Sequence, residues 1–259
     1  MRTNPADRPD QPDRLDVPGR TERPDELELR PLSARSVVLS LLLGAHPPEL
    51  PAKELVRQVE AFGVGGSTAR AALSRMVAAG DLRRTDTVHR LSDRLLERQR
   101  RQDDAVHPRT RAWDGDWEML VITVTGRGPA ERADLRTRLA ALRLAELREG
   151  VWLRPANLSR PLPTDLAQVG ERCTTRPDRP AAELAAQLWP LDAWAAKGRA
   201  LLAHTARVDG PADRFTAFAA VVRHLLADPV LPTGLLPADW PGTALRTAYA
   251  DYRRELGTR

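Results

Sequence analysis

The sequence contains a single cysteine, Cys173, which excludes an intramolecular disulfide and a cysteine-rich metal site. Long apolar runs are also missing. The longest, from Val37 to Leu43, is interrupted by Ser40, whereas a membrane-spanning helix needs roughly 20 apolar residues. The N-terminus has no apolar core of the kind found in secretory signals. We therefore expect a cytoplasmic protein that does not span a membrane.

The motifs of several common enzyme classes are absent too. The sequence has no Gly-x-Ser-x-Gly elbow, no phosphate-binding loop ending in Gly-Lys-Ser/Thr and no His-Glu-x-x-His zinc pair. The five histidines are scattered, and each is interpreted as a surface residue or a hydrogen-bonded core residue. We identify no partner basic site for Cys173, so we interpret it as a small buried apolar residue. We expect no catalytic site, no metal and no cofactor.

Lysine is scarce: of 40 basic residues, only Lys53 and Lys197 are lysine. Such an arginine bias by itself indicates a GC-rich genome, but the charge is unevenly placed. Residues 1–30 carry a net −2, residues 31–101 a net +5 and residues 102–259 a net +2. Concentrated arginine favours a polyanionic partner, because neutralised phosphates release counterions. Aromatic residues make up 4% of the chain, and Phe62 is the only one between 31 and 101, so DNA is favoured over RNA.

Composition also divides the chain. Residues 1–30 repeat Pro, Asp and Arg with few large apolar side chains, which predicts a disordered acidic tail. Residues 31–92 show three short helical patterns, the first capped by Ser33 and ending at Gly44, and the second opened by Pro51. A glycine-rich turn at 63–66 precedes the third, and residues 82–91 suit a hairpin. This order predicts a winged helix-turn-helix domain.

The third helix carries the sharpest chemical signal. We predict that it runs from Ser67, as N-cap, to Ala79, with Gly80 closing it. An α-helix fits the DNA major groove, where arginine can hold guanine O6 and N7 with two hydrogen bonds. The residues predicted to contact DNA are Ser67, Thr68, Arg70, Ala71, Ser74 and Arg75 on this helix and Arg83, Arg84 and Arg90 on the hairpin.

The remaining sequence predicts a linker helix at 93–111 and two further domains, giving an α+β fold. A buried strand at 117–125, a helix at 129–148 ended by Gly150, and a strand at 151–154 form half of a ferredoxin-like unit. Residues 166–169 and 171–175 supply its second half, so the unit spans 112–180. Helices at 181–188, 191–206, 212–226 and 243–256, interrupted by the proline-rich stretch 228–242, form a helical domain over 181–259.

Three blocks in this order resemble the PaaX-type (phenylacetic acid catabolon repressor) family of transcriptional regulators. The first joins Ala34-Arg35-Ser36-Val37 to the third helix, which reads T-A-R-A-A-L-S-R-M from Thr68 to Met76. The second joins W-D-G-D-W at 113–117 to G-V-W-L-R-P at 150–155. The third joins L-W-P-L-D at 188–192 to Asp228-Pro229 and L-L-P-A-D-W-P-G at 235–242.

The resemblance implies a winged-helix domain, a Cas2-like ferredoxin domain that dimerises and a C-terminal helical domain that senses an effector. It implies a homodimeric repressor that binds an inverted-repeat operator in double-stranded DNA and is released by an acyl-CoA, phenylacetyl-CoA in the best-known members. The hairpin departs from the family in having no aromatic residue, and the acidic tail is extra. No family ligand motif matches residue by residue, so the effector site is unassigned. Trp152 and Arg154 are interpreted as a core tryptophan and a strand-end arginine.

Two alternatives remain open at this stage. A Cas2-like domain could be a metal-dependent nuclease, for which Asp114 and Asp116 at the start of the strand are the candidate ligands. The winged helix could also bind protein and not DNA.

Overall fold

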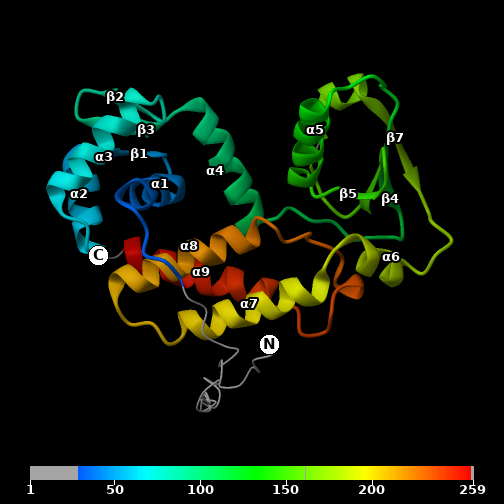
Figure 1. Cartoon of the computed structure of the whole chain (residues 1–259). Helices are drawn as coiled ribbons and strands as arrows, with labels where there is room; N and C mark the ends of the chain where they lie inside the picture. The colour runs from blue at the N-terminus through cyan, green and yellow to red at the C-terminus, as the bar shows by residue number, and fades with distance from the viewer. Residues whose placement is uncertain (1–28, 161, 258–259) are drawn as a thin grey trace, which may run out of the picture.

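The computed structural model describes residues 29–160 and 162–257, so the predicted disordered tail lies outside the described residues except for its last two positions. The fold is α+β, as the sequence predicts. Figure 1 shows the blue and cyan N-terminal helices with a small sheet at one end, a second sheet in green at the other, and the C-terminal helices running beneath both. Within the described ranges, no helix has the length and apolarity to cross a membrane.

The N-terminal part has the element order that we predicted for a winged helix-turn-helix, with one added strand. Ser33 caps the first helix by accepting a hydrogen bond from Ser36 N at 3.2 Å. The added strand follows this helix and pairs with the hairpin, giving an antiparallel sheet of order β1-β3-β2. The elements are α1 (Ala34–Gly44), β1 (Glu49–Pro51), α2 (Ala52–Ala61), α3 (Gly66–Ala78), β2 (Leu82–Thr85) and β3 (Val88–Leu91).

The predicted start of the third helix was wrong by two residues. The N-cap of α3 is Gly65, in an extended conformation, and Ser67 lies in the first turn. Helix α2 approaches closely at Gly66, where a Cβ would lie 2.3 Å from Glu60 Oε1 and 3.4 Å from Val56 Cγ1. Helix α3 therefore begins at Gly66, next to α2. The Ser67 side chain is exposed and does not cap the helix.

The predicted linker helix is α4 (Asp93–Val106), and it packs against α1. Its buried Gln99 donates to Leu43 O at 3.2 Å and to Ala45 O at 2.8 Å, satisfying carbonyls at the end of α1. This helix therefore connects the N-terminal helices rigidly to the central part of the chain.

The central part has ferredoxin-like topology. Its sheet is antiparallel throughout with strand order β5-β6-β4-β7, and α5 with a short 3₁₀ helix covers one face. This is the split β-α-β arrangement with its second helix reduced to one turn of 3₁₀ structure. The elements are β4 (Trp117–Ile122), α5 (Pro129–Ala141), β5 (Ala145–Arg148), β6 (Val151–Pro155), η1 (Thr164–Gln168) and β7 (Gly170–Thr175).

Four predictions for this part were wrong. The helix predicted at 129–148 ends at Ala141, because Arg143 adopts a left-handed φ of 60° and residues 145–148 pair with β6 as a strand. Gly150, at φ 79°, forms the turn between these two strands and does not cap a helix. The strand predicted at 117–125 ends at Ile122. Cys173 is exposed, because β7 lies at the edge of the sheet.

The C-terminal helices cover two different surfaces. The first packs with η2 against the open face of the sheet, around Trp117 and Leu153. The other three share one hydrophobic core with α1–α4, in which Leu42 and Leu55 join Val221 and Leu245. In Figure 1 the blue and cyan helices accordingly rest on the orange and red ones. The elements are α6 (Ala181–Leu188), α7 (Leu191–Thr205), α8 (Pro211–Leu225), η2 (Thr233–Leu235) and α9 (Gly242–Gly257).

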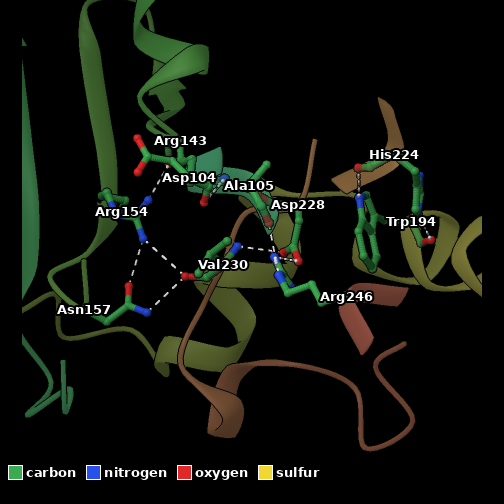
Figure 2. Close-up of polar contacts among 10 residues, drawn as sticks. All are labelled: Asp104, Ala105, Arg143, Arg154, Asn157, Trp194, His224, Asp228, Val230 and Arg246. Carbon is green, nitrogen blue, oxygen red and sulfur yellow. Dashed lines mark hydrogen bonds and ion pairs between the residues drawn. The ribbon is translucent and has the colours of Figure 1, made fainter. Parts of the chain in front are cut away.

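A buried polar junction joins the sheet to the C-terminal helices (Figure 2). Arg154 on β6 has no exposed surface and donates to Asn157 Oδ1 at 2.8 Å, to Arg143 O at 3.3 Å and to Val230 O at 3.4 Å. Burial lowers its pKa to about 9. Arg154 lies near the end of β6, as we predicted from the sequence. Its side chain, however, is buried and holds the 228–230 loop against the sheet. Trp152 is a core residue, as interpreted.

The same junction reaches the end of α4. Arg246 on α9 donates to Ala105 O at 3.1 Å and to the buried Asp228 carboxylate at 2.8 Å. Nearby, His224 donates from Nε2 to Trp194 O at 3.0 Å, and its ring stacks on the indole. Hydrogen bonds thus connect α4, the sheet and α9 in addition to the apolar cores.

Candidate nucleic-acid interface

Helix α3 presents one exposed face that contains every residue predicted on it. The opposite face is apolar and buried against α1 and α2, as expected from the 3.6-residue helical period. All six predicted positions are exposed, namely Ser67, Thr68, Arg70, Ala71, Ser74 and Arg75, and the buried ones are Ala69, Ala72, Leu73 and Met76.

The two arginines of this face have no partner in the part of the protein that the structure describes. Within residues 29–160 and 162–257, no hydrogen bond or salt bridge holds the guanidinium of Arg70 or Arg75. Arg57 on the neighbouring helix α2 differs, because it is paired with Glu54 at 2.6 Å. Arg70 and Arg75 are therefore free to bind an anion outside the protein.

The arginines of the hairpin are less free than the sequence suggested. Arg83 is paired with Asp93 at the start of α4, and Arg84 Nε donates to Asp86 O at 2.8 Å in the β2–β3 turn. Arg90, opposite Arg83 in the register, is exposed and has no hydrogen bond or salt bridge among the described residues. All three lie at the surface, but Arg90 is the one best placed to contact a ligand without first losing a protein partner.

A residue that the sequence analysis missed holds α3 in place. Asp81, just beyond the end of α3, has a side chain only 5% exposed and accepts hydrogen bonds from Arg35 of α1 and Arg94 of α4. An acidic residue directly after the Gly80 helix stop was the available signal, but its two partners are 46 and 13 residues away in sequence. Asp81 fixes the C-terminal end of α3 relative to both neighbouring helices.

The nuclease candidates lie apart from this face, in the central part. Asp114 and Asp116 both face Arg176, which is 3.9 Å from Asp114 and hydrogen-bonded to Asp116. Among the described residues, no group of three or more His, Cys, Asp or Glu side chains could hold a metal ion. The structure does not bring a third acidic or histidine ligand to this pair.

The fold is that of an α+β protein with N-terminal helices, a small three-stranded sheet and a central ferredoxin-like sheet. Three family models match successive parts of it: PaaX-like protein at residues 33–95, PaaX protein central Cas2-like domain at 110–172 and PaaX-like protein C-terminal domain at 184–259. The chain belongs to the PaaX family, which supports a role as a transcription regulator.

One similar solved structure is "Uncharacterized protein Rv0674 from Mycobacterium tuberculosis". It is 51% identical, covers 87% of this chain and 96% of its own, and superposes with a TM-score of 0.75. The comparison with curated proteins gave no match.

Proposed function

We propose that the protein is a sequence-specific DNA-binding transcription regulator, and that it acts as a repressor. The observation that carries this proposal is the exposed face of α3, where Arg70 and Arg75 point away from the core and have no partner among the described residues. An exposed arginine pair on a short helix, next to a basic hairpin, suits insertion into the major groove.

Each part of this face has a distinct chemical role in the proposal. Arg70 and Arg75 read base edges, since arginine binds guanine O6 and N7 in a bidentate manner. Ser67 and Thr68 lie in the first turn of α3, where free backbone N–H groups and the helix dipole favour a phosphate. Arg90 on β3 binds the DNA backbone, with Arg83 and Arg84 contributing only when they leave their protein partners.

The finer assignments come from the family and remain proposals. The ferredoxin-like part forms a homodimer, so the operator is an inverted repeat with half-sites about one helical turn, or a multiple of it, apart. An acyl-CoA effector acts through the C-terminal helices. The core that α1–α4 share with α7–α9 supports this, because a change among the C-terminal helices would reach α1 directly.

Selection of bound duplexes from a randomised DNA library tests the proposal. We expect enrichment of an inverted repeat, bound at least about a thousandfold more tightly than scrambled DNA of equal length. The affinity should fall steeply and linearly on a log–log plot against salt concentration. Equal affinity for the enriched and scrambled duplexes would contradict sequence-specific binding. Absence of any DNA binding would favour the protein-interaction alternative.

A further inference from the structure

A hollow of about 160 Å³ lies among α1, α4, α8 and α9, and none of the α3 residues lines it. In Figure 1 it lies where the blue helix rests on the orange and red ones. Its lining is about as polar as apolar: Arg98 and Arg223 lie beside Leu39, Phe218 and Leu226. A partner that fits this lining must therefore present charged and apolar side chains close together.

The charged side chains of the lining all carry the same sign. They are four arginines, and no Asp or Glu of the described chain lines the hollow. Arg35 is paired with Asp81, but Arg98 and Arg223 have no hydrogen bond or salt bridge in the part of the chain that the structure describes. Partial burial, and after it repulsion from Arg35, lowers the pKa of Arg98. Carboxylates beside Arg98 and Arg223 would supply the missing counter-charge.

The apolar part of the lining is incompletely covered. Leu226, directly after α8, is 40% exposed, and Val124 is the only other large apolar side chain among the described residues that is exposed to this degree. Leu32 also lines the hollow and packs, partly buried, against the helical core. Because Leu32 directly precedes the start of α1, the chain reaches α1 along the hollow.

The sequence just before the described residues has the complementary pattern. It reads D-E-L-E from Asp25 to Glu28, so one leucine lies among three carboxylates. Leu29, which follows, packs against the same helical core as Leu32. Four extended residues reach about 13 Å from it. Acidic and apolar side chains are therefore available next to a lining that combines arginine with leucine.

We propose that residues 25–28 dock in this hollow of the same molecule, with their carboxylates beside Arg98 and Arg223 and the Leu27 side chain over Leu226. Each exposed ion pair contributes little, but attachment through residues 29–32 gives the segment a high effective concentration at the hollow. Ordering the segment costs conformational entropy, so the contact forms at low salt and is lost when salt screens the charges. The contact does not depend on DNA binding.

Distance measurements by electron paramagnetic resonance on the full-length protein test the contact. Cys173 is exposed, so the background variant is C173S. Spin labels are attached at T21C, before the segment, and at A227C, an exposed position next to Leu226. We expect the distance distribution in 0.01 M salt to be about twofold narrower than in 1 M salt, where the Debye length falls to about 3 Å. A distribution that is equally broad at both salt concentrations would contradict the proposal.

Neutralising the acidic residues shows which carboxylates make the contact. D25N/E26Q/E28Q should give, at low salt, the broad distribution that the wild type has in 1 M salt. The matched control D10N/D13N/D16N removes three carboxylates that are nine or more residues before the segment, and it should keep the narrow distribution. Equal broadening in the two triple variants would overturn the assignment, because it would reflect net charge alone.

Two further variants locate the contact on the folded part of the chain. R98Q/R223Q removes the two unpaired arginines of the hollow and should broaden the low-salt distribution as much as D25N/E26Q/E28Q does. R148Q/R207Q removes two exposed arginines that do not line the hollow, and it should keep the distribution narrow. Equal distributions in these two variants would refute the hollow as the docking site. D25N/E26Q/E28Q tests the proposal even if R98Q/R223Q fails to fold.

Dilution of the labelled protein with a tenfold excess of unlabelled protein distinguishes contact within one molecule from contact between copies. We expect the narrow distribution to persist on dilution. Its disappearance would overturn the proposal, because the segment would then occupy the hollow of another copy.

The contact has one consequence that rests on the proposed function. With residues 25–28 docked, Arg98 and Arg223 are not available to DNA phosphates. D25N/E26Q/E28Q should therefore bind scrambled DNA with a log–log salt slope that is steeper by about 1–2, because each added phosphate contact contributes about −0.9. D10N/D13N/D16N should keep the wild-type slope. An equal slope in the wild type and D25N/E26Q/E28Q would refute this consequence, whereas a protein that binds no DNA would refute the proposed function; the distance measurement decides the contact in both cases.

Discussion

The guanidinium of Arg35 on α1 donates to the carboxylate of Asp81 at 2.8 Å, and Asp81 lies just beyond the end of α3. Arg94 on α4 binds the other oxygen of the same carboxylate. One nearly buried acidic side chain therefore connects α1, α3 and α4, and α3 carries the proposed DNA-binding face. We call these two ion pairs, Asp81 with Arg35 and Asp81 with Arg94, the Asp81 clamp. They make the orientation of α3 depend on both α1 and α4.

Removing the negative charge of Asp81 should destabilise the protein. In D81N, the buried position loses its charge-assisted hydrogen bonds, and we expect the free energy of unfolding to fall by about 1–3 kcal/mol. Operator affinity should fall as well, because α3 is held less firmly. Urea denaturation followed by circular dichroism measures the first effect. D93N removes the exposed partner of Arg83 and should change stability by less than about 1 kcal/mol. If D81N and D93N lower the free energy of unfolding equally, the ion pairs of Asp81 stabilise the protein no more than the exposed pair of Arg83 and Asp93.

Arg154 should be a major contributor to the stability of the junction between the sheet and the 228–230 loop. R154M leaves the acceptors Arg143 O and Asn157 Oδ1 without the Arg154 donor, while Val230 O keeps only the hydrogen bond from Asn157 Nδ2, so the free energy of unfolding should fall by about 2–4 kcal/mol. R154K should not restore it, because an ammonium cannot reproduce the planar geometry. R148M, at an exposed position of β5, is the matched control and should be nearly neutral. Thermal melts of the three variants measure these differences, and a melt of R154M like that of wild type would contradict the prediction.

Two buried histidines predict acid sensitivity. Burial lowers the pKa of His224 and of His89, with Arg84 adding to the effect at His89. Above pH about 6.5, the usual histidine value, both are neutral in the folded and unfolded states. As the pH falls below this value, the unfolded state takes up protons first, so the free energy of unfolding decreases. We expect stability to drop as the pH falls from about 6.5 to 5.5, measured by urea denaturation, and the H89Q/H224Q double variant to show a smaller drop. The same pH dependence in that variant would refute this assignment.

Local patterns predicted most of the helices correctly. Ser33 caps α1 as expected, and the spacing of the apolar residues in α3 accounts for its exposed face. The wrong predictions of element boundaries arise where tertiary contacts override the local sequence pattern. Residues 140–148 are good helix formers, yet 145–148 form a strand because pairing with β6 outweighs helix propensity. The helix ends before Arg143, whose positive φ is unusual for a residue other than glycine and leaves no pattern in sequence.

In the candidate site, too, local sequence patterns predicted some features, whereas features that depend on tertiary contacts could not be predicted. The period of one helix places Arg70 and Arg75 at the surface, so they could be predicted without a fold. The partners of Arg83 and the clamp at Asp81 depend on where α4 packs. Arg154 could not be recognised as buried, because its acceptor Val230 is 76 residues away along the chain.

The most direct test of the central claim compares R70A, R75A and R101A on the selected operator and on a scrambled duplex, by fluorescence anisotropy at fixed salt. R101A removes an exposed arginine of α4 outside the α3 face and controls for net charge. We expect R70A and R75A each to weaken operator binding by about 10- to 100-fold, since a bidentate arginine–guanine contact contributes about 1–3 kcal/mol of discrimination. Binding to the scrambled duplex should change only about as much as in R101A. If R70A and R75A keep the wild-type preference for the operator, α3 is not the element that reads DNA.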